Sequence, residues 1–340
     1  MKAFLVSIAC LIAATGTAEW RVQPSGTTAQ FRGISVVDEK VAWLAGSMGT
    51  YGRMVDGSNW FCAQIPGAEK LMFRSVVGFD SNHAVLLAIG PGEQSKIFAT
   101  SDGGLSWTIR WSNEDPKAFY DSIAFWDRGH GIAFSDPVDK RIPLVVTQDG
   151  GLTWQRLRSV SMPAALKDEG AFSASGTCIA VSGKSDVWIA TGGAAVSRVF
   201  HSRDRALNWT VCETPIPGGK PTAGVFGLRF SGNKRGIAVG GDYKVPKTGG
   251  RQIAITDNGG LSWRFVSKVF PVGLREAASY VGSQIVVVGP SGSDSSADGG
   301  KSWTALSGTP DGLHTCDFFG PFGWAAGDSG LIAKWVRTDH

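Results

Sequence analysis

An eight-residue segment recurs along the chain and restricts its fold more than any other feature. Four copies end in Trp after a Gly-Gly pair, and they read TSDGGLSW (100–107), TQDGGLTW (147–154), TDNGGLSW (256–263) and SADGGKSW (296–303). A worn copy, SRDRALNW (202–209), lacks the glycines, and a weaker one, VDGSNW, ends at Trp60. Self-similarity at a period of roughly 20 to 50 residues indicates that one supersecondary unit is repeated.

The residue types of this segment are those of a tight turn. Asp and Ser or Thr side chains can bond backbone groups within the turn, and Gly supplies the backbone conformations that the turn needs. The Trp then begins the next strand and packs between neighbouring repeats. A catalytic or sugar-binding role is the alternative, but we interpret the segments as structural staples of hairpins. Their Asp or Asn and Trp residues are Asp102, Trp107, Asp149, Trp154, Asp204, Trp209, Asn258, Trp263, Asp298 and Trp303.

Two further patterns indicate how many repeats the chain contains. Trp recurs at positions 20, 60, 107, 154, 209, 263 and 303, with gaps of 40 to 55 residues. Apolar strands that close on a small residue also occur seven times, ending at Gly46, Gly90, Ser135, Gly192, Gly240, Gly289 and Gly327. Units of this length suit four strands each, so we predict an all-β, seven-bladed β-propeller.

The two ends of the chain fit a closed ring. The last repeat supplies strands at 324–327 and 331–335 and is then one strand short, while the segment 19–23 precedes the first full repeat. We expect this N-terminal strand to pair into the last blade, which closes the ring and protects its edges. Residues 19–340 then form one propeller domain that does not tolerate loss of residues 19–24. A closed ring needs no partner for its edges, so we expect a monomer.

The first 18 residues have the layout of a signal peptide. Lys2 is followed by an apolar run over residues 3–14 and then by small residues, with cleavage expected after Ala18. Lipid attachment at Cys10 is the less favoured alternative. We therefore expect export to the periplasm or the extracellular space. No later segment approaches the roughly 18 apolar residues of a membrane helix, so no stable membrane insertion is expected.

Cysteine spacing and charge narrow the function classes. Cys62, Cys178, Cys212 and Cys316 lie far apart, without the spacing of a metal site. Each lies beside apolar residues, so we expect mainly free thiols in the core, with partial pairing left open. We expect no metal and no cofactor. The formal net charge is +4, and no dense Lys/Arg run indicates nucleic-acid binding.

A ligand site is expected where the innermost strands of the blades line the central channel. Aligned copies of these strands begin with an apolar residue and place Arg32, Arg74, Tyr120, Ser173, Phe226, Arg275 and His314 at the second position. Because successive strand residues face opposite sides, all but the apolar Phe226 could point into one mouth. The three arginines would then clamp a carboxylate or phosphate. The alternative is a set of separate surface arginines paired with Asp121 and Glu276, which are also candidate site residues.

The connections after the second strands lie near the same mouth and carry further candidates. They include Asp136, Asp242 and Asp328, and binding loops commonly occupy such positions on rigid scaffolds. Capping of the turns by these aspartates is the alternative.

The repeated turns, together with the phrase WAAGDSGLI at 324–332, resemble the Asp-box (BNR-repeat) propellers of the sialidase-like superfamily. They are similar to the photosystem II assembly and stability factor-like proteins among these. The resemblance covers residues 20–336 and implies turns on the rim, away from a central site. In the photosynthetic members an arginine patch is thought to engage a partner protein. Arg32, Arg74 and Arg275 are similar in kind, without a residue-by-residue match.

The resemblance also suggests an enzyme as the alternative. A sialidase needs an arginine triad, a Tyr nucleophile with a Glu base, and an Asp acid, and its Arg-Ile-Pro motif precedes the first Asp-box. The one Arg-Ile-Pro here, at 141–143, lies inside the third repeat, and the chain has only four Tyr. No nucleophile elbow or phosphate loop is present. We therefore predict a non-catalytic exported propeller that binds a protein or acidic small ligand through its central mouth. The alternative is a glycan-active hydrolase or lectin.

Overall fold

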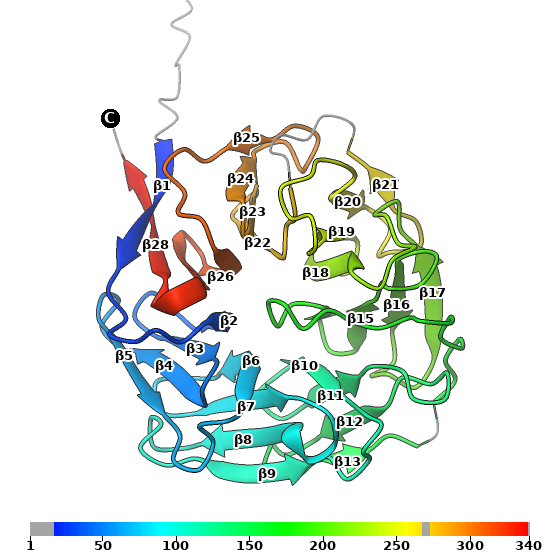
Figure 1. Cartoon of the computed structure of the whole chain (residues 1–340), viewed down its shortest axis with the longest axis horizontal. Helices are drawn as coiled ribbons and strands as arrows, with labels where there is room; N and C mark the ends of the chain where they lie inside the picture. Colours follow the sequence, from blue (N-terminus) through cyan, green and yellow to red (C-terminus); the bar gives the residue numbers. More distant parts are fainter. Residues whose placement is uncertain (1–16, 159, 267–272, 339–340) are drawn as a thin grey trace, which may run out of the picture.

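The strands form seven four-stranded antiparallel sheets arranged as blades around a central axis (Figure 1). The computed structural model describes residues 17–158, 160–266 and 273–338. The predicted signal peptide lies outside the described residues except for Thr17 and Ala18, which belong to the first strand. The predicted seven-bladed β-propeller is confirmed.

Six blades are built from four consecutive strands, ordered from the centre outward. Their strands are β2 (Phe31–Val36), β3 (Ala42–Gly46), β4 (Thr50–Met54) and β5 (Trp60–Gln64) in blade 1; β6 (Met72–Gly78), β7 (Ala84–Ile89), β8 (Lys96–Thr100) and β9 (Thr108–Ser112) in blade 2; β10 (Tyr120–Phe125), β11 (Gly131–Ser135), β12 (Leu144–Thr147) and β13 (Gln155–Arg156) in blade 3; β14 (Ile179–Ser182), β15 (Asp186–Ala190), β16 (Arg198–Ser202) and β17 (Trp209–Glu213) in blade 4; β18 (Ala223–Ser231), β19 (Arg235–Asp242), β20 (Ile253–Thr256) and β21 (Arg264–Phe265) in blade 5; β22 (Ala277–Val281), β23 (Gln284–Gly289), β24 (Gly292–Ser296) and β25 (Thr304–Ala305) in blade 6.

The seventh blade joins the two ends of the described chain. It contains β26 (Leu313–Phe319), β27 (Phe322–Gly327), β28 (Ile332–Thr338) and, as its outermost strand, β1 (Thr17–Gln23). Trp20 of β1 pairs with Trp335 of β28, and their ring centroids lie 4.9 Å apart. The Trp20 indole also donates a 3.1 Å hydrogen bond to Ser293 of blade 6. The predicted closure by the N-terminal strand is therefore present.

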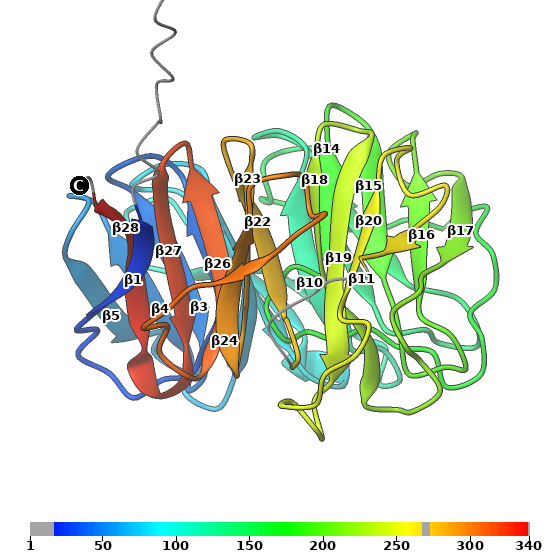
Figure 2. The same cartoon turned by 90° about the horizontal axis from the view of Figure 1, so that it is seen from above.

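The core lies between neighbouring blades. The second strands, such as β7 with its sequence AVLLAI, are apolar on both faces because a blade packs against each side. The Trp residues of the repeated turns pack toward the preceding blade, as Trp107 does against Trp43 and Tyr51 of blade 1, with centroids 6.0 and 5.2 Å away. The side view shows the blades standing side by side (Figure 2).

The repeated turns share one set of hydrogen bonds. In the second blade Thr100 Oγ1 donates to Asp102, accepts the backbone N–H of Gly104, and Asp102 accepts both the N–H and the hydroxyl of Ser106. The same bonds occur around Asp149 and Asp298, while Asn208 and Asn258 preserve most of them in the divergent copies. These aspartates therefore bind their own turns.

Two short 3-10 helices are the only helices in the described part of the chain, and its cysteines form no disulfide. The helices are η1 (Gly92–Gln94) and η2 (Asp328–Gly330). Among the described residues all four cysteines are free; Cys178 and Cys316 are buried, and Cys62 and Cys212 are half-buried. In that same part of the chain no helix has the length and apolar character needed to cross a bilayer.

Candidate functional site at the central mouth

A segment of blade 4, residues 173–177, reaches the innermost strands of the other blades and is here named the central segment. It is held by hydrogen bonds from all six other blades. The donor or acceptor groups in those blades are Arg32, Arg74, Ser122, the Leu228 backbone N–H, the Glu276 carbonyl and Thr315. The channel is therefore interrupted, and the mouth above the central segment is a cavity with a floor.

β-Bulges direct side chains into this mouth. Five inner strands carry one extra residue near their start, which leaves it without a partner in the neighbouring strand. Such a bulge turns the side chain out of the regular alternation of the strand. The five extra residues are Arg32, Arg74, Asp121, Phe226 and His314.

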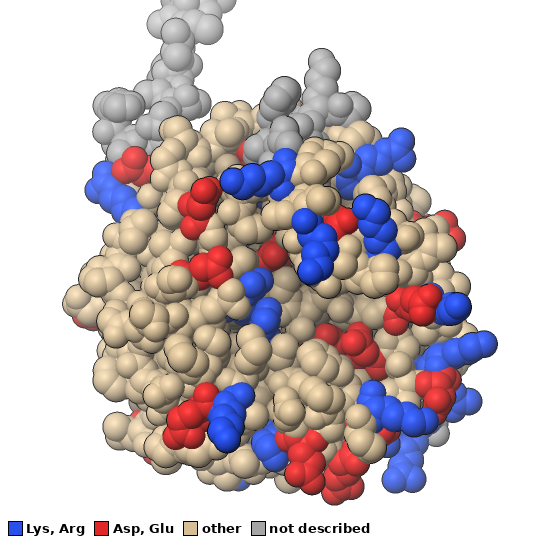
Figure 3. All heavy atoms as spheres, in the orientation of Figure 1, with Lys and Arg blue, Asp and Glu red and all other residues tan. Residues whose placement is uncertain are grey.

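The cavity has a volume of about 660 Å³, and the centre of this face is visibly hollowed (Figure 3). Seven of the predicted residues meet in its lining, namely Arg32, Arg74, Asp121, Asp136, Ser173, Glu276 and His314. They come from six different blades, so the convergence depends on the whole ring.

The two arginines of the cavity differ in their partners. Arg32 forms an ion pair with Glu276 at 3.1 Å and bonds the Ala174 carbonyl. The Arg74 guanidinium bonds only the Ser173 carbonyl and has no carboxylate within ion-pair distance among the described residues. Burial and the neighbouring positive charge of Arg32 lower the pKa of Arg74 to about 10, so it remains a cation at neutral pH. Arg74 can therefore receive an anionic group from a ligand.

His314 connects two carboxylates at the mouth through a series of polar contacts. His314 is buried, its Nδ1 lies 2.7 Å from Glu276 and its Nε2 lies 2.9 Å from Asp328. Gln30 donates to the same Asp328 oxygen. Because Glu276 also binds Arg32, these contacts neutralise Arg32 and leave Arg74 as the cation without a carboxylate partner in the described lining.

Two acidic side chains of blade 3 share the cavity. Asp136 accepts the backbone N–H of Ala171, and burial raises its pKa to about 6. Burial and the charge of Asp136 raise the pKa of Asp121 well above its usual range, and its Oδ2 has no hydrogen-bond partner among the described residues. This pair therefore holds a proton near neutral pH.

An aromatic ledge lies in the same cavity. The rings of Phe172 and Phe226 stack at 4.2 Å with an angle of 5° between planes, and Tyr243 meets both edge-on. The cavity thus combines an apolar surface with a cation, Arg74, that has no carboxylate partner in the described part of the chain. Phe172 and Phe226 occur in the aligned inner-strand copies, but neither was predicted to bind a ligand, because both are apolar.

Four predicted residues, Tyr120, Arg275, Asp242 and Asp328, do not line the cavity, and the first two correct the alignment of the inner strands. Tyr120 is fully buried against Trp111, because it starts β10 and the bulge falls on Asp121 instead. Arg275 is also buried, in an ion pair with Asp294 at 3.0 Å, and Glu276 takes its expected place.

The third residue, Asp242, does not line the cavity. It binds Lys220 at 3.3 Å and accepts the N–H of Lys244, as a turn-capping residue does. Hydrogen bonds from Thr222, Lys244 and Lys220 outweigh its partial burial and lower its pKa. The described residues contain no group of His, Cys, Asp and Glu side chains placed to hold a metal ion.

No family model matches the sequence, and no curated protein matches it significantly. Solved structures do resemble the fold. YCF48 bound to D1 peptide aligns with a TM-score of 0.68 at 20% identity, over 94% of this chain and 97% of that chain. YCF48 from Cyanidioschyzon merolae aligns with a TM-score of 0.66 at 17% identity, over 93% and 98%. A catalytically inactive virginiamycin B lyase from Staphylococcus aureus with quinupristin has a TM-score of 0.64 at 12% identity, over 94% and 99%. The chain is thus similar in fold to these solved structures.

Proposed function

We propose that this chain is a non-catalytic exported propeller that binds a protein segment or an acidic small ligand through its central mouth. The observation that carries the proposal is the environment of Arg74. This cation lines the cavity, and none of the carboxylates of the described residues pairs with it. A guanidinium offers a carboxylate two parallel hydrogen bonds, which are stronger than bonds between neutral groups.

The aromatic ledge supports a ligand with an apolar part. Phe172, Phe226 and Tyr243 present a rigid surface beside Arg74 in one cavity. A protein segment that carries a carboxylate next to an apolar side chain matches both features. A small acidic ligand with a ring or an alkyl chain would match them as well.

The structural similarities support the same reading. A YCF48 structure was solved with a D1 peptide bound, so a propeller of this shape can hold a peptide. The repeated turns, with their shared hydrogen bonds, support our assignment of the chain to the Asp-box propellers of the sialidase-like superfamily. The apolar run at residues 3–14 supports export.

A pull-down from the exported protein fraction tests the proposal. Tagged wild-type protein is compared with Arg74→Ala and with Arg203→Ala, whose exposed arginine lies in the repeated turn of blade 4 and outside the cavity. We expect Arg74→Ala to recover at least about tenfold less partner, the equivalent of roughly 1.4 kcal/mol or more. Equal recovery by Arg74→Ala and wild type would refute a cationic mouth.

A hydrolase is the second candidate, favoured by one observation. Asp121 and Asp136 share the cavity with Arg32 and Arg74, and their raised pKa values suit a carboxyl pair in which one member donates a proton. A panel of fluorogenic glycosides tests this candidate. Turnover by the wild type that is lost in Asp136→Asn would establish an enzyme. No turnover of any glycoside in the panel would exclude the hydrolase candidate.

A further inference from the structure

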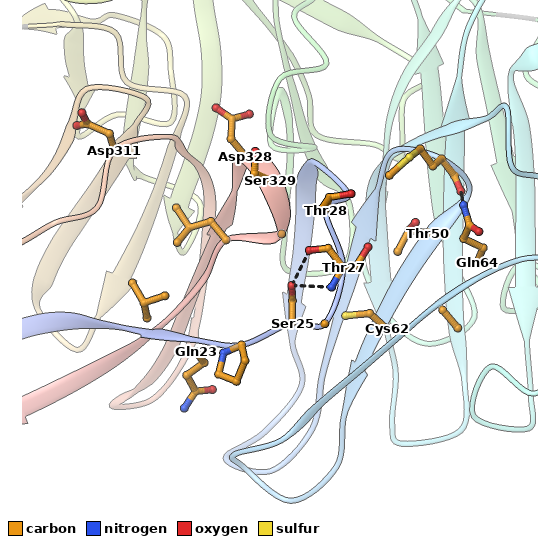
Figure 4. A pocket seen from close by; sticks show the side chains of 17 residues that line it. Gln23, Ser25, Thr27, Thr28, Thr50, Cys62, Gln64, Asp311, Asp328 and Ser329 are labelled. Carbon is orange, nitrogen blue, oxygen red and sulfur yellow. Dashed lines mark hydrogen bonds between the residues drawn. The ribbon is translucent and has the colours of Figure 1, made fainter.

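A second cavity lies between the outermost strands of the last and the first blade, β1 and β5 (Figure 4). Its volume is about 1100 Å³, larger than that of the mouth. It is here named the closure groove. Its walls come from β1, β5, the connection at 24–28, the connection that contains Met48, and the residues around Asp328.

Two polar atoms of the closure groove are buried without a partner among the described residues. They are Thr50 Oγ1 and Gln23 Oε1. Thr50 is only 2% exposed, and it is one of the side chains that line the groove (Figure 4). An unsatisfied buried polar group costs about 1–3 kcal/mol, so a ligand that bonds either atom would recover this free energy.

The charge of the groove is opposite to that of Arg74 in the mouth. Asp311 and Asp328 line it, and no Lys or Arg is among its lining residues. Asp311 is exposed and has no ion-pair partner within the described ranges. A cavity lined by charge of one sign attracts a ligand of the other.

The groove is also flanked by sheet edges. β1 and β5 are the outermost strands of their sheets, so each has an edge on which no described strand pairs. Such edges are templates for an added extended chain. Exposed apolar side chains lie beside them, with Val22 60% and Met48 41% exposed.

We propose that the closure groove is a second binding site, for an extended polypeptide segment that carries basic side chains. The backbone of the segment bonds a free strand edge, its polar groups satisfy Thr50 and Gln23, and a basic side chain meets Asp311. The site is distinct from the mouth, from which the contact between His314 and Asp328 separates it.

Cys62 is a natural reporter for this site, because its thiol lines the groove. Cys212, half-buried in the outermost strand of blade 4, serves as an internal control. The probe is an acetylated and amidated peptide with three Val-Arg repeats; its Val-Glu counterpart and chitohexaose are the comparison ligands. Alkylation of both thiols by iodoacetamide is followed by mass spectrometry at about pH 9, since burial raises the pKa of Cys62 to about 11.

At about ten times its Kd, the Val-Arg peptide should slow alkylation of Cys62 about tenfold and leave Cys212 unchanged. Asp311→Asn and Thr50→Val should each weaken this protection several-fold, whereas Arg74→Ala should not alter it. Protection that persists in Arg74→Ala separates this proposal from the proposed function of the mouth. No protection of Cys62, equal protection of Cys212, or equal protection by the Val-Glu peptide or by chitohexaose overturns the proposal.

Discussion

The turns on one face of the ring repeat one set of hydrogen bonds in five blades, whereas the side chains that the blades contribute to the mouth are of several kinds. In each turn the Ser or Thr hydroxyl accepts the N–H four residues later, at 2.8 to 3.0 Å. The positions marked by bulges at the mouth hold arginine, aspartate, phenylalanine and histidine. The regular face stabilises the hairpins of the blades, and the irregular face carries the varied side chains of the candidate site.

Aspartate shows the difference most clearly. In the turns, hydrogen bonds from Ser106 and Thr100 lower the pKa of Asp102 to about 2. At the mouth, burial raises the pKa of Asp136 to about 6. The same residue type therefore stabilises a turn as an anion on one face and is protonated more easily, because of burial, on the other.

The largest effect is expected from Arg275→Ala, inside blade 6. This change leaves Asp294, which is fully buried, without its counter-charge. Breaking a buried pair on one side costs about 3–5 kcal/mol of unfolding free energy. Urea unfolding monitored by Trp fluorescence measures the loss, and Arg203→Ala in a repeated turn is the control. Wild-type stability of Arg275→Ala would show that the pair is not buried as described.

A smaller loss is expected from Gly176→Ala in the central segment. Gly176 has φ of +69°, and an added Cβ would lie 2.6 Å from the carbonyl oxygen of Arg74. We expect a loss of about 1–3 kcal/mol. Gly183→Ala is the matched control, because its φ is +58° but its Cβ would meet no atom within 4 Å. Equal thermal shifts of the two variants would mean that the central segment is not tightly held.

Stability should depend on pH in opposite ways for Asp136, which lines the mouth, and for Asp242, which caps a turn outside it. The raised pKa of Asp136 means that the folded state binds the extra proton, so its stabilising contribution is lost as pH rises from about 4 through about 6. Asp136→Asn removes this loss and keeps the acceptor for the Ala171 N–H. The Tm of Asp136→Asn should therefore exceed that of the wild type above pH 6 and equal it near pH 4.

Asp242→Asn is the opposite case. The pKa of Asp242 is lowered, so its contribution is present above the unfolded pKa and is lost as pH falls. Its Tm should lie below that of the wild type near neutral pH and approach it in acid. Parallel Tm profiles for the two variants would contradict the burial of Asp136.

The smallest effect is expected in a repeated turn. Asn258 already occupies the aspartate position of its copy, accepts the N–H of Ser262 and donates to its hydroxyl. Asp149→Asn should therefore change the unfolding free energy by no more than about 0.5 kcal/mol. Asp149→Ala, which removes both kinds of bond, should lower Tm further. A much larger loss of unfolding free energy in Asp149→Asn would show that the turn stabilises more than its own hairpin.

The sequence was sufficient for the ring because its three repeated patterns are local. The turn residues, the Trp after each turn and the apolar second strands each reveal their environment within a few positions. Trp20, with no turn before it, identified the closing strand through its spacing from Trp60.

Two of the inner strands, those of blades 3 and 6, were aligned one residue out of register, because neighbouring residues there could each take the buried position. In FYDS at 119–122, either Phe119 or Tyr120 could be the buried apolar position, and the structure selects Tyr120. The central segment, SASGT, resembles an ordinary loop of small residues. Its place at the centre depends on bonds to six other blades, which no local pattern records.

The closing strand also sets an order of events. Trp20 donates its hydrogen bond to Ser293, 273 residues further along the chain, and pairs with Trp335 beyond it. Contacts between such distant residues form late, because the chain between them must first be brought together. Blades 1 to 6 are built entirely from residues 31–305, so they can assemble before β1 pairs with β28 and covers Trp20. Until that pairing forms, the incomplete seventh blade has open strand edges, which favour aggregation.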